Sequence, residues 1–169
     1  MMNVAPFVES LGGQPVAVFG LARSGLSTVR ALKDAGVIVY AWDDREEAQD
    51  AAKELGANVQ PIEEIIADCG CLVLAPGVPL THPEPHPVVK AAQAADVEIL
   101  CDIEILYRSI KDIPYPPRLV GITGTNGKST TTALMTHVLS ENKVKAWMGG
   151  NIGVPALDLE LPEDEGVYV

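Results

Sequence analysis

The sequence has little of what marks membrane, secreted or nucleic-acid-binding proteins. It has no run of about 18 apolar residues, the length of a transmembrane helix, and its N-terminus lacks a basic stretch followed by an apolar one. Lysine and arginine number only 12 against 23 acidic residues, so the net charge is −11 and a polyanion would be repelled. We therefore expect a cytoplasmic location, no membrane insertion and no nucleic-acid partner.

Cysteine is also scarce. Cys69, Cys71 and Cys101 are odd in number and stand in apolar surroundings. A C-x-C pair could bind a metal, but no second pair or nearby histidine accompanies it, so buried reduced thiols are the better interpretation. His82 and His86 fall in a proline-rich segment and are interpreted as loop residues rather than metal ligands.

Residues 1–113 alternate between short apolar runs and amphipathic segments, the pattern of a parallel α/β sheet. Strands are expected at 15–20, 37–42 and 72–75, with a helix at 24–35. The remaining expected elements are helices at 45–55, at 62–67, at 87–95 and beyond a capping Asp102, and a strand at 97–100. The fold class is therefore α/β with a Rossmann-like parallel sheet.

A glycine turn, GLARSG, joins the first strand to the first helix. In a parallel sheet Gly20, Asp43 and Gly77 would follow three strands at one carboxyl edge, where ligands of open α/β sheets bind. An acid about twenty residues after such a turn is typical of dinucleotide binding. However, Ala22 replaces the middle glycine of G-x-G-x-x-G. Two interpretations therefore stay open: the turn binds a nucleotide, or its glycines are needed only for the geometry of the turn.

A second glycine loop lies in residues 119–132, LVGITGTNGKSTTT. The apolar run 119–122 predicts a buried strand, and a helix begins at Lys128. Ile122 stands where the pattern G-x-x-x-x-G-K-[ST] has its first glycine, so a tight turn with a solvated lysine is the alternative. The inward face of the helix is expected to hold Leu134, Met135, Val138 and Leu139.

A strand, a glycine loop and Lys-Ser at a helix start form the arrangement that holds polyphosphates. Free backbone N–H groups and the positive end of the helix dipole meet the anion. Lys128 would contact the β and γ phosphates, and the Ser129 hydroxyl would be a ligand of Mg²⁺. The candidate phosphate-binding residues are Gly124, Thr125, Asn126, Gly127, Lys128, Ser129 and Thr130.

Proline separates two regions of the chain. Residues 114–118, PYPPR, permit neither a helix nor a central strand and predict a linker between domains at 1–113 and 119–169. The second domain would contain strands at 144–148 and 166–169 and a short helical segment at 155–159. Because one helix and partial strands cannot bury a full sheet, we expect an incomplete domain whose residues 160–169 lack partner strands.

Six segments together resemble the Mur ligase family. They are GLARSG (20–25), DDR (43–45), APGVPLTHP (75–83), DIEI (102–105), GITGTNGKST (121–130) and GGNIGVPAL (149–157). The resemblance extends from about residue 14 to the end of the chain. Within this family, the order of the segments resembles that of the ligases that add D-glutamate to UDP-N-acetylmuramoyl-L-alanine in peptidoglycan synthesis.

The resemblance implies a Rossmann-like UDP-binding domain followed by the start of a P-loop ATPase domain. It implies that backbone N–H groups of Arg23 and Ser24 hold the UDP diphosphate. It further implies substrate contacts at Asp43, Asp44 and Arg45 for uracil, Gly77 at the uridine and Asn151 near the N-acetylmuramoyl-alanine portion.

The implied reaction uses ATP and Mg²⁺. ATP phosphorylates the alanyl carboxylate to an acyl phosphate, which the D-glutamate amine attacks. Lys128 and Ser129 would serve this step, with Ser129 as a Mg²⁺ ligand and Thr130 beside the nucleotide. The family's D-glutamate site and its other metal ligands would lie beyond residue 169, so we expect this chain alone to be inactive.

Three alternatives stay open. The first is an NAD-dependent oxidoreductase with Asp43 on a ribose hydroxyl, although such enzymes have no use for a lysine-containing phosphate loop. The second is a ligase of the same family with a different amino acid or a folate substrate, and the UDP-type segments disfavour folate. The third is a non-catalytic nucleotide-binding or regulatory module.

Overall fold

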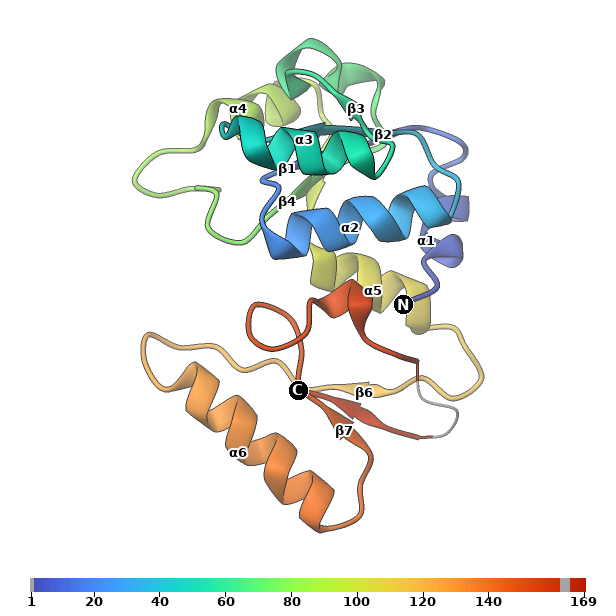
Figure 1. The fold of residues 1–169 in the computed structure, drawn as a ribbon, viewed down its shortest axis with the longest axis vertical. Coiled ribbons are helices and arrows are strands. Elements are labelled where there is room, and N and C mark those ends of the chain that lie inside the picture. Colours follow the sequence, from blue (N-terminus) through green and yellow to red (C-terminus); the bar gives the residue numbers. More distant parts are fainter. Residues whose placement is uncertain (1, 162–164) are drawn as a thin grey trace.

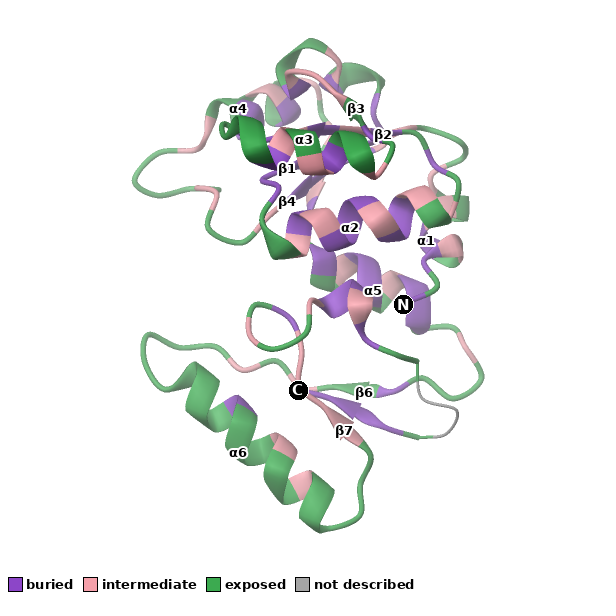
Figure 2. Ribbon diagram, viewed as in Figure 1, coloured by how far each residue is buried: buried purple, intermediate pink, exposed green. Residues whose placement is uncertain are grey.

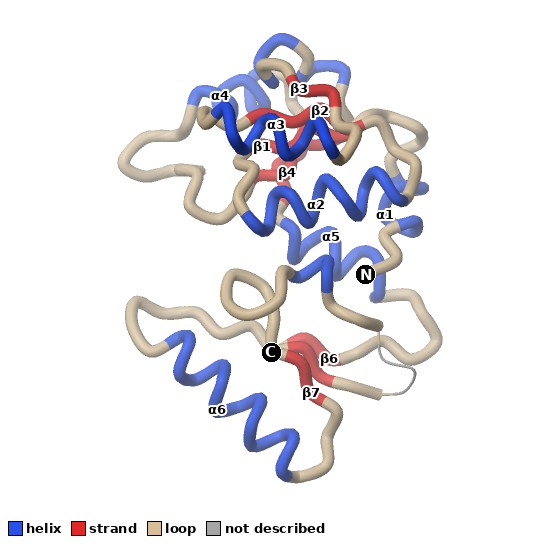
Figure 3. The backbone as a smooth tube through the Cα atoms, viewed as in Figure 1, coloured by secondary structure: helices blue, strands red, loops and turns tan. Residues whose placement is uncertain are grey.

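The computed structural model describes residues 2–161 and 165–169 and contains two parallel sheets (Figures 1 and 3). The first region consists of α1 (Ala5–Ser10), β1 (Val16–Phe19), α2 (Arg23–Asp34), β2 (Val39–Trp42), α3 (Glu46–Glu54), β3 (Asn58–Val59), the 3₁₀ turns η1 (Ile62–Glu64) and η2 (Ile66–Asp68), β4 (Cys71–Leu74), α4 (Pro87–Ala94), β5 (Glu98–Leu100) and α5 (Asp102–Ile110). The second consists of β6 (Arg118–Leu119), α6 (Lys128–Glu141), β7 (Ala146–Trp147), η3 (Ala156–Asp158) and β8 (Val167–Tyr168).

The first sheet has five parallel strands in the order β3-β2-β1-β4-β5. Val16 of β1 lies opposite Val39 of β2 and Cys71 of β4. Every residue of β1 and β4 is buried, because a parallel sheet covered on both faces needs continuous apolar strands. The predicted Rossmann-like parallel sheet is therefore confirmed, while α1 and the short β3 are elements that the sequence analysis missed.

Helices cover both faces of this sheet. Val16 and Val18 of β1 point to the face covered by α1, α2, α3 and α5, whereas Ala17 and Phe19 point to the face covered by η1, η2 and α4. This alternation follows from the two-residue period of a strand. The result is two apolar cores that hold the carboxyl ends of the strands in fixed positions.

The turn between β1 and α2 depends on two glycines. Gly20 has φ +90°, a backbone conformation that other residues rarely adopt. A Cβ atom at Gly25 would lie 1.9 Å from the carbonyl oxygen of Gly20. The helix therefore approaches the strand end closely only because both positions are glycine.

The second sheet is much smaller. Its strands are parallel in the order β6-β8-β7, and each is two residues long. The predicted strand at 119–122 is wrong as a buried strand, because β6 ends at Leu119 and that side chain is 38% exposed. The expectation that 160–169 lacks partner strands is also wrong for β8, which pairs on both sides; residues 162–164 lie outside the described residues.

Helix α6 leaves most of its surface exposed, as Figure 2 shows. The predicted inward face is wrong, because Leu134 is 59% and Val138 49% exposed, Met135 is exposed and Leu139 is half-buried. A groove of about 530 Å³ separates these side chains from the small sheet. Strands of two residues present too little apolar surface to cover a helix of 14 residues.

The segment around η3 packs against the first region. Leu157 and Ala156 are fully buried in the core that contains α2 and α5. The Met2 N–H donates to the Leu157 carbonyl at 2.9 Å, and Arg30 lies 3.4 Å from Asp158. The boundary at 114–118 stays a prediction, but residues after it complete the core of the residues before it.

The cysteines only partly follow expectation. Cys69 and Cys71 are buried, and burial raises the pKa of their thiols to about 11 and about 12, so both stay protonated at neutral pH. Cys101 is exposed, which corrects the expectation that all three are buried. No helix in the described part of the chain is long and apolar enough to cross a membrane.

Candidate functional site

Three segments meet at the carboxyl edge of the first sheet, as predicted. Gly20 follows β1, and its N–H donates to the Trp42 carbonyl at the end of β2 at 3.0 Å. On the other side, the Ala75 N–H donates to the Phe19 carbonyl at 3.0 Å. A Cβ atom at Gly20 would lie 2.7 Å from the Cβ of Ala75, so the glycine turn and the segment after β4 touch.

The start of α2 presents backbone N–H groups at this edge. Ala22 is the N-cap residue in an extended conformation, and among the described residues no side chain caps the helix. The first turn, which begins with Arg23 and Ser24, contains no acidic residue. Free N–H groups and the helix dipole therefore favour an anion at this position.

Asp43 fastens the glycine turn to the end of β2. Its buried carboxylate accepts hydrogen bonds from the Leu21 N–H at 2.6 Å, from the Arg45 N–H at 3.0 Å and from Arg45 Nε at 3.0 Å. Burial raises the pKa of Asp43, but these hydrogen bonds together outweigh it and hold the pKa below its ordinary value. Both carboxylate oxygens are thus occupied within the protein.

The neighbouring predicted residues are more exposed than Asp43. Asp44 is 75% exposed at its side chain and Arg45 65%. Gly77 is exposed with φ +98° and has open space around its Cα. Of the predicted uridine-site residues, Asp43 and Arg45 are thus paired with each other, although the Arg45 side chain is largely exposed, and Asp44 and Gly77 face solvent.

A small chamber of about 10 Å³ lies beneath the glycine turn, lined by Ser24, Thr28 and Asp102 among others. The buried Asp102 carboxylate accepts a hydrogen bond from the Ile103 N–H at 3.0 Å. Burial raises the pKa of Asp102 above its ordinary value. Cys101, not Asp102, is the N-cap residue of α5, which corrects the expected cap.

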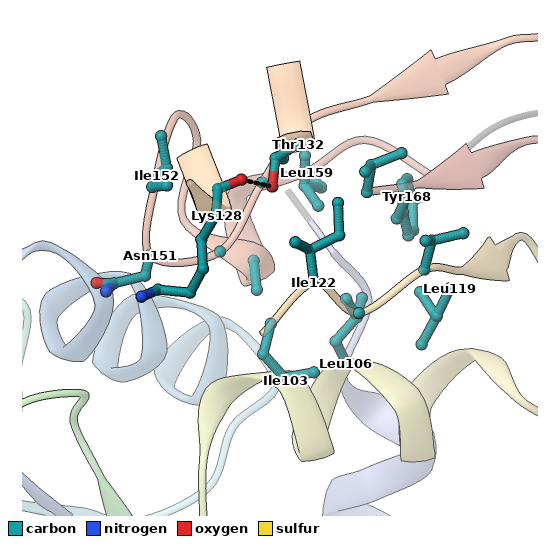
Figure 4. A pocket seen from close by; sticks show the side chains of 16 residues that line it. Ile103, Leu106, Leu119, Ile122, Lys128, Thr132, Asn151, Ile152, Leu159 and Tyr168 are labelled. Atoms are coloured by element: carbon teal, nitrogen blue, oxygen red, sulfur yellow. Dashed lines mark hydrogen bonds between the residues drawn. The ribbon is translucent and has the colours of Figure 1, made fainter. Parts of the chain in front are cut away.

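A larger pocket of about 260 Å³ lies between α5 and the second region (Figure 4). Its walls are mostly apolar side chains, including Ile103 and Leu106 of α5. Lys128 and Asn151 are polar residues that line it, and Figure 4 shows both side chains converging at one end. The structure thus brings together two predicted site residues from separate motifs.

Lys128 folds back onto its own loop. Its Nζ donates to the Gly124 carbonyl at 2.6 Å and lies 3.5 Å from the Thr125 carbonyl. Gly124 and Gly127 have φ +143° and +78°, so both glycines are required by the loop geometry. The amine is held where the loop turns into α6.

The remaining predicted phosphate-binding residues lie in the same loop and in the first turn of α6. Asn126, Ser129 and Thr130 are exposed, and α6 has no acidic residue in its first turn. A cation, exposed hydroxyls and free helix N–H groups fit a polyphosphate with a divalent cation. No cluster of three or more metal-binding side chains occurs among the described residues.

The N-terminus of α5 lies between the two sites. Asp102 lines the chamber beneath the α2 turn, whereas the next residue, Ile103, lines the pocket of Lys128 and Asn151. The sequence placed both residues in a capped helix and in the segment DIEI (102–105), but it did not predict this position between two sites. The sequence analysis also placed His86 only in a loop, whereas it is the N-cap residue of α4. The available signal was Pro87, because proline is common at the first position of a helix and the residue before it is then the cap.

Comparison with known proteins identifies the family of this chain. The family model of the Mur ligase MurD-like N-terminal domain matches residues 14–101. The chain is 48% identical over 162 residues to the UDP-N-acetylmuramoylalanine–D-glutamate ligase of Sphingopyxis alaskensis, covering 95% of this chain and 36% of that protein. It is 46% identical to the protein of the same name from Caulobacter sp. strain K31, covering 96% and 35%.

The chain thus spans about a third of the length of the curated relatives it matches. Among solved structures, shikimate 5-dehydrogenase from Thermus thermophilus is similar with a TM-score of 0.47 and 22% identity, covering 63% of this chain and 53% of that one. A likeness of that extent carries no functional argument. The family model and the sequence identity to the two ligases show that this chain belongs to the Mur ligase family, with a MurD-like N-terminal domain.

Proposed function

We propose that this chain is the UDP-substrate-binding part and the beginning of the P-loop ATP-binding domain of a cytoplasmic ligase of peptidoglycan synthesis. The ligase would add D-glutamate to UDP-N-acetylmuramoyl-L-alanine. The observation that carries the proposal is the position of α5. Its first residue, Asp102, lines the chamber below the α2 turn, and its second residue, Ile103, lines the pocket of Lys128. A substrate held at the first site can extend past α5 to the second.

The UDP portion would lie at the carboxyl edge of the first sheet. The diphosphate would accept hydrogen bonds from the backbone N–H groups of Arg23 and Ser24 at the start of α2. The exposed Asp44, Arg45 and Gly77 would contact the uridine. Asp43 would position Arg45, because its carboxylate already accepts hydrogen bonds from Leu21 and Arg45.

The same geometry disfavours an NAD-dependent oxidoreductase. Such an enzyme would need a free carboxylate on Asp43 to accept hydrogen bonds from a ribose diol. Both oxygens of Asp43 instead accept hydrogen bonds from Leu21 and Arg45. Recruiting Asp43 for a ribose would break the contact that ties the glycine turn to β2.

ATP and Mg²⁺ would bind at the loop 124–130. Lys128 Nζ would exchange the Gly124 carbonyl for phosphate oxygens, and the exposed Ser129 and Thr130 hydroxyls would lie beside the cation and the nucleotide. Mg²⁺ supplies positive charge to the transferring phosphoryl group. Asn151, at the same end of the pocket, would orient the N-acetylmuramoyl-alanine portion toward Lys128.

The proposed reaction has two steps. The γ-phosphoryl group of ATP passes to an oxygen of the alanyl carboxylate, and ADP leaves. The amine of D-glutamate then attacks the carbonyl carbon, and phosphate leaves as the amide bond forms. Both steps require positioned charge more than a protein nucleophile. We assign no residue of this chain to D-glutamate, so the chain alone should release no phosphate when D-glutamate is added.

Calorimetric titration tests the proposal. The chain should bind UDP-N-acetylmuramoyl-L-alanine saturably and should not bind NAD. Lys128→Ala should abolish Mg-ATP binding and leave UDP-sugar binding unchanged. Lys143→Ala, which removes an exposed lysine just beyond the other end of α6, is the matched control and should change neither. NAD binding without UDP-sugar binding would overturn the assignment.

A further inference from the structure

His86 lies at the carboxyl edge of the first sheet, beside the proposed uridine site. Its ring packs on Phe19, the last residue of β1, with ring centroids 4.5 Å apart and planes inclined by 45°. Its backbone N–H donates to the Pro79 carbonyl at 2.9 Å, which closes the loop after β4. The ring is therefore held in place by a strand end and by its own loop.

The contacts of His86 determine which ring nitrogen carries the proton. Nδ1 accepts a hydrogen bond from the Val88 N–H at 3.3 Å and caps α4. A ring nitrogen that accepts a hydrogen bond has no proton, so the neutral ring carries its proton on Nε2. Nε2 is therefore a hydrogen-bond donor at the sheet edge.

This donor faces Asp44 without being satisfied by it. The distance from His86 Nε2 to Asp44 Oδ2 is 3.9 Å, too long for a hydrogen bond. Asp44 is 75% exposed at its side chain, and no shorter polar contact of its carboxylate occurs among the described residues. A fixed donor and a free acceptor thus stand next to each other where the base would lie.

We propose that His86 Nε2–H and the Asp44 carboxylate together recognise the pairing edge of uracil. This inference rests on the proposed UDP-binding function and adds a specificity determinant to it. The N–H of His86 would donate to O4 of the base, and Asp44 would accept from the N3–H. Cytosine held in the same position by its ribose diphosphate presents an amino group to His86 and a lone pair to Asp44. Donor would meet donor and acceptor would meet acceptor.

Titration with UDP and with CDP tests this pair. The wild-type chain should bind UDP about a hundredfold more tightly than CDP, because cytosine mismatches two polar contacts and each is worth about tenfold. His86→Ala should weaken UDP binding by about tenfold and leave CDP binding nearly unchanged, so the preference for UDP should fall about tenfold and the rest of it should be due to Asp44. Asp44→Asn should shift the preference toward CDP, because an amide can donate to the cytosine lone pair.

Two further variants separate recognition from a structural role. His86→Asn keeps a side-chain acceptor that can cap α4 but places no donor at the Nε2 position, so it should keep its thermal stability while its preference for UDP falls about tenfold. His82→Ala removes an exposed histidine of the same loop that contacts only Thr81 Oγ1, at 3.1 Å, among the described residues, and should have no effect.

The outcomes are distinct. If the wild-type chain binds neither nucleotide, the proposed function itself fails. If it binds both equally, or if His86→Asn keeps the wild-type preference, the UDP-binding function stands and the role of His86 is wrong. A preference for UDP that falls about tenfold in His86→Asn and is unchanged in His82→Ala supports the inference.

Discussion

The two parallel sheets of this chain have the same kind of turn but differ in packing. In each region a strand leads through a glycine loop into a helix, yet α2 buries Val29 and Leu32 completely whereas α6 leaves Leu134 59% exposed. The first sheet has five strands and helices on both faces; the second has three strands of two residues each. A helix is buried only as far as the sheet beneath it extends.

The difference extends to the loops themselves. A Cβ atom at Gly25 would lie 1.9 Å from the Gly20 carbonyl oxygen, whereas one at Gly121 or Gly127 would meet nothing within 4 Å. The α2 turn is held by packing and by Asp43, whereas the loop before α6 is held by Lys128 on its own carbonyls. The first candidate site is thus preorganised by the core, and the second depends on contacts that a ligand can replace.

The largest expected effect comes from adding a methyl group to the first turn. Gly25→Ala should reduce the free energy of unfolding of the first region by more than about 4 kcal/mol, because strand and helix must separate. Gly121→Ala is the matched control in the second loop and should change it by less than about 0.5 kcal/mol. Urea denaturation measures both, and similar losses would remove the contrast between the loops.

A smaller effect is expected from shortening one leucine on each helix. Leu32→Ala in α2 should cost roughly 3 kcal/mol, since it leaves a cavity in a closed core. Leu134→Ala in α6 should cost less than about 0.5 kcal/mol because that side chain is mostly solvated. A loss above about 2 kcal/mol for Leu134→Ala in the same denaturation experiment would show that α6 is covered in solution.

The smallest effect concerns the polar contact that holds the α2 turn. Asp43→Asn should cost about 1–3 kcal/mol at neutral pH, because the amide NH2 group replaces one carboxylate oxygen and would face N–H donors of Arg45 or of Leu21. Since the pKa of Asp43 is below its ordinary value of 3.8 in the folded protein, its carboxylate stabilises the fold above that pH. The difference from wild type should therefore shrink as the pH falls through the folded pKa.

Denaturation curves at several pH values check this dependence. Asp50→Asn is the control, because Asp50 is 70% exposed at its side chain and pairs only with Lys53 among the described residues. It should change stability by less than about 0.5 kcal/mol at every pH. An Asp43→Asn difference that stays constant into acid would show that the charge of Asp43 contributes nothing.

Local patterns predicted the first region well. Buried parallel strands appear as continuous apolar runs, and the turn 20–25 is marked by glycines that the geometry requires. The meeting of Gly20, Asp43 and the segment of Gly77 at one edge followed from the topology of parallel strands. Short elements without a strong period, such as α1 and β3, gave no comparable signal.

The errors concentrate in the second region. The apolar residues of α6 predicted a buried helix face, and the apolar run from Leu119 predicted a buried strand. In the structure Leu119, Leu134 and Val138 are exposed. Periodicity specifies a face but does not report what covers it. In the first region, Cys101 was expected to be buried because its neighbours in the sequence are apolar, but it lies exposed between β5 and α5.

By itself, the sequence determined the α/β class, the two glycine loops and the order of the elements, because these depend on residues close together in the chain. Only the tertiary structure decided which polar groups are already paired and which are free. It showed that Asp43 is engaged with Leu21 and Arg45, that His86 faces Asp44, and that α5 joins the two candidate sites. Such pairings depend on distances between segments far apart in the sequence, and those distances are set by packing of the cores.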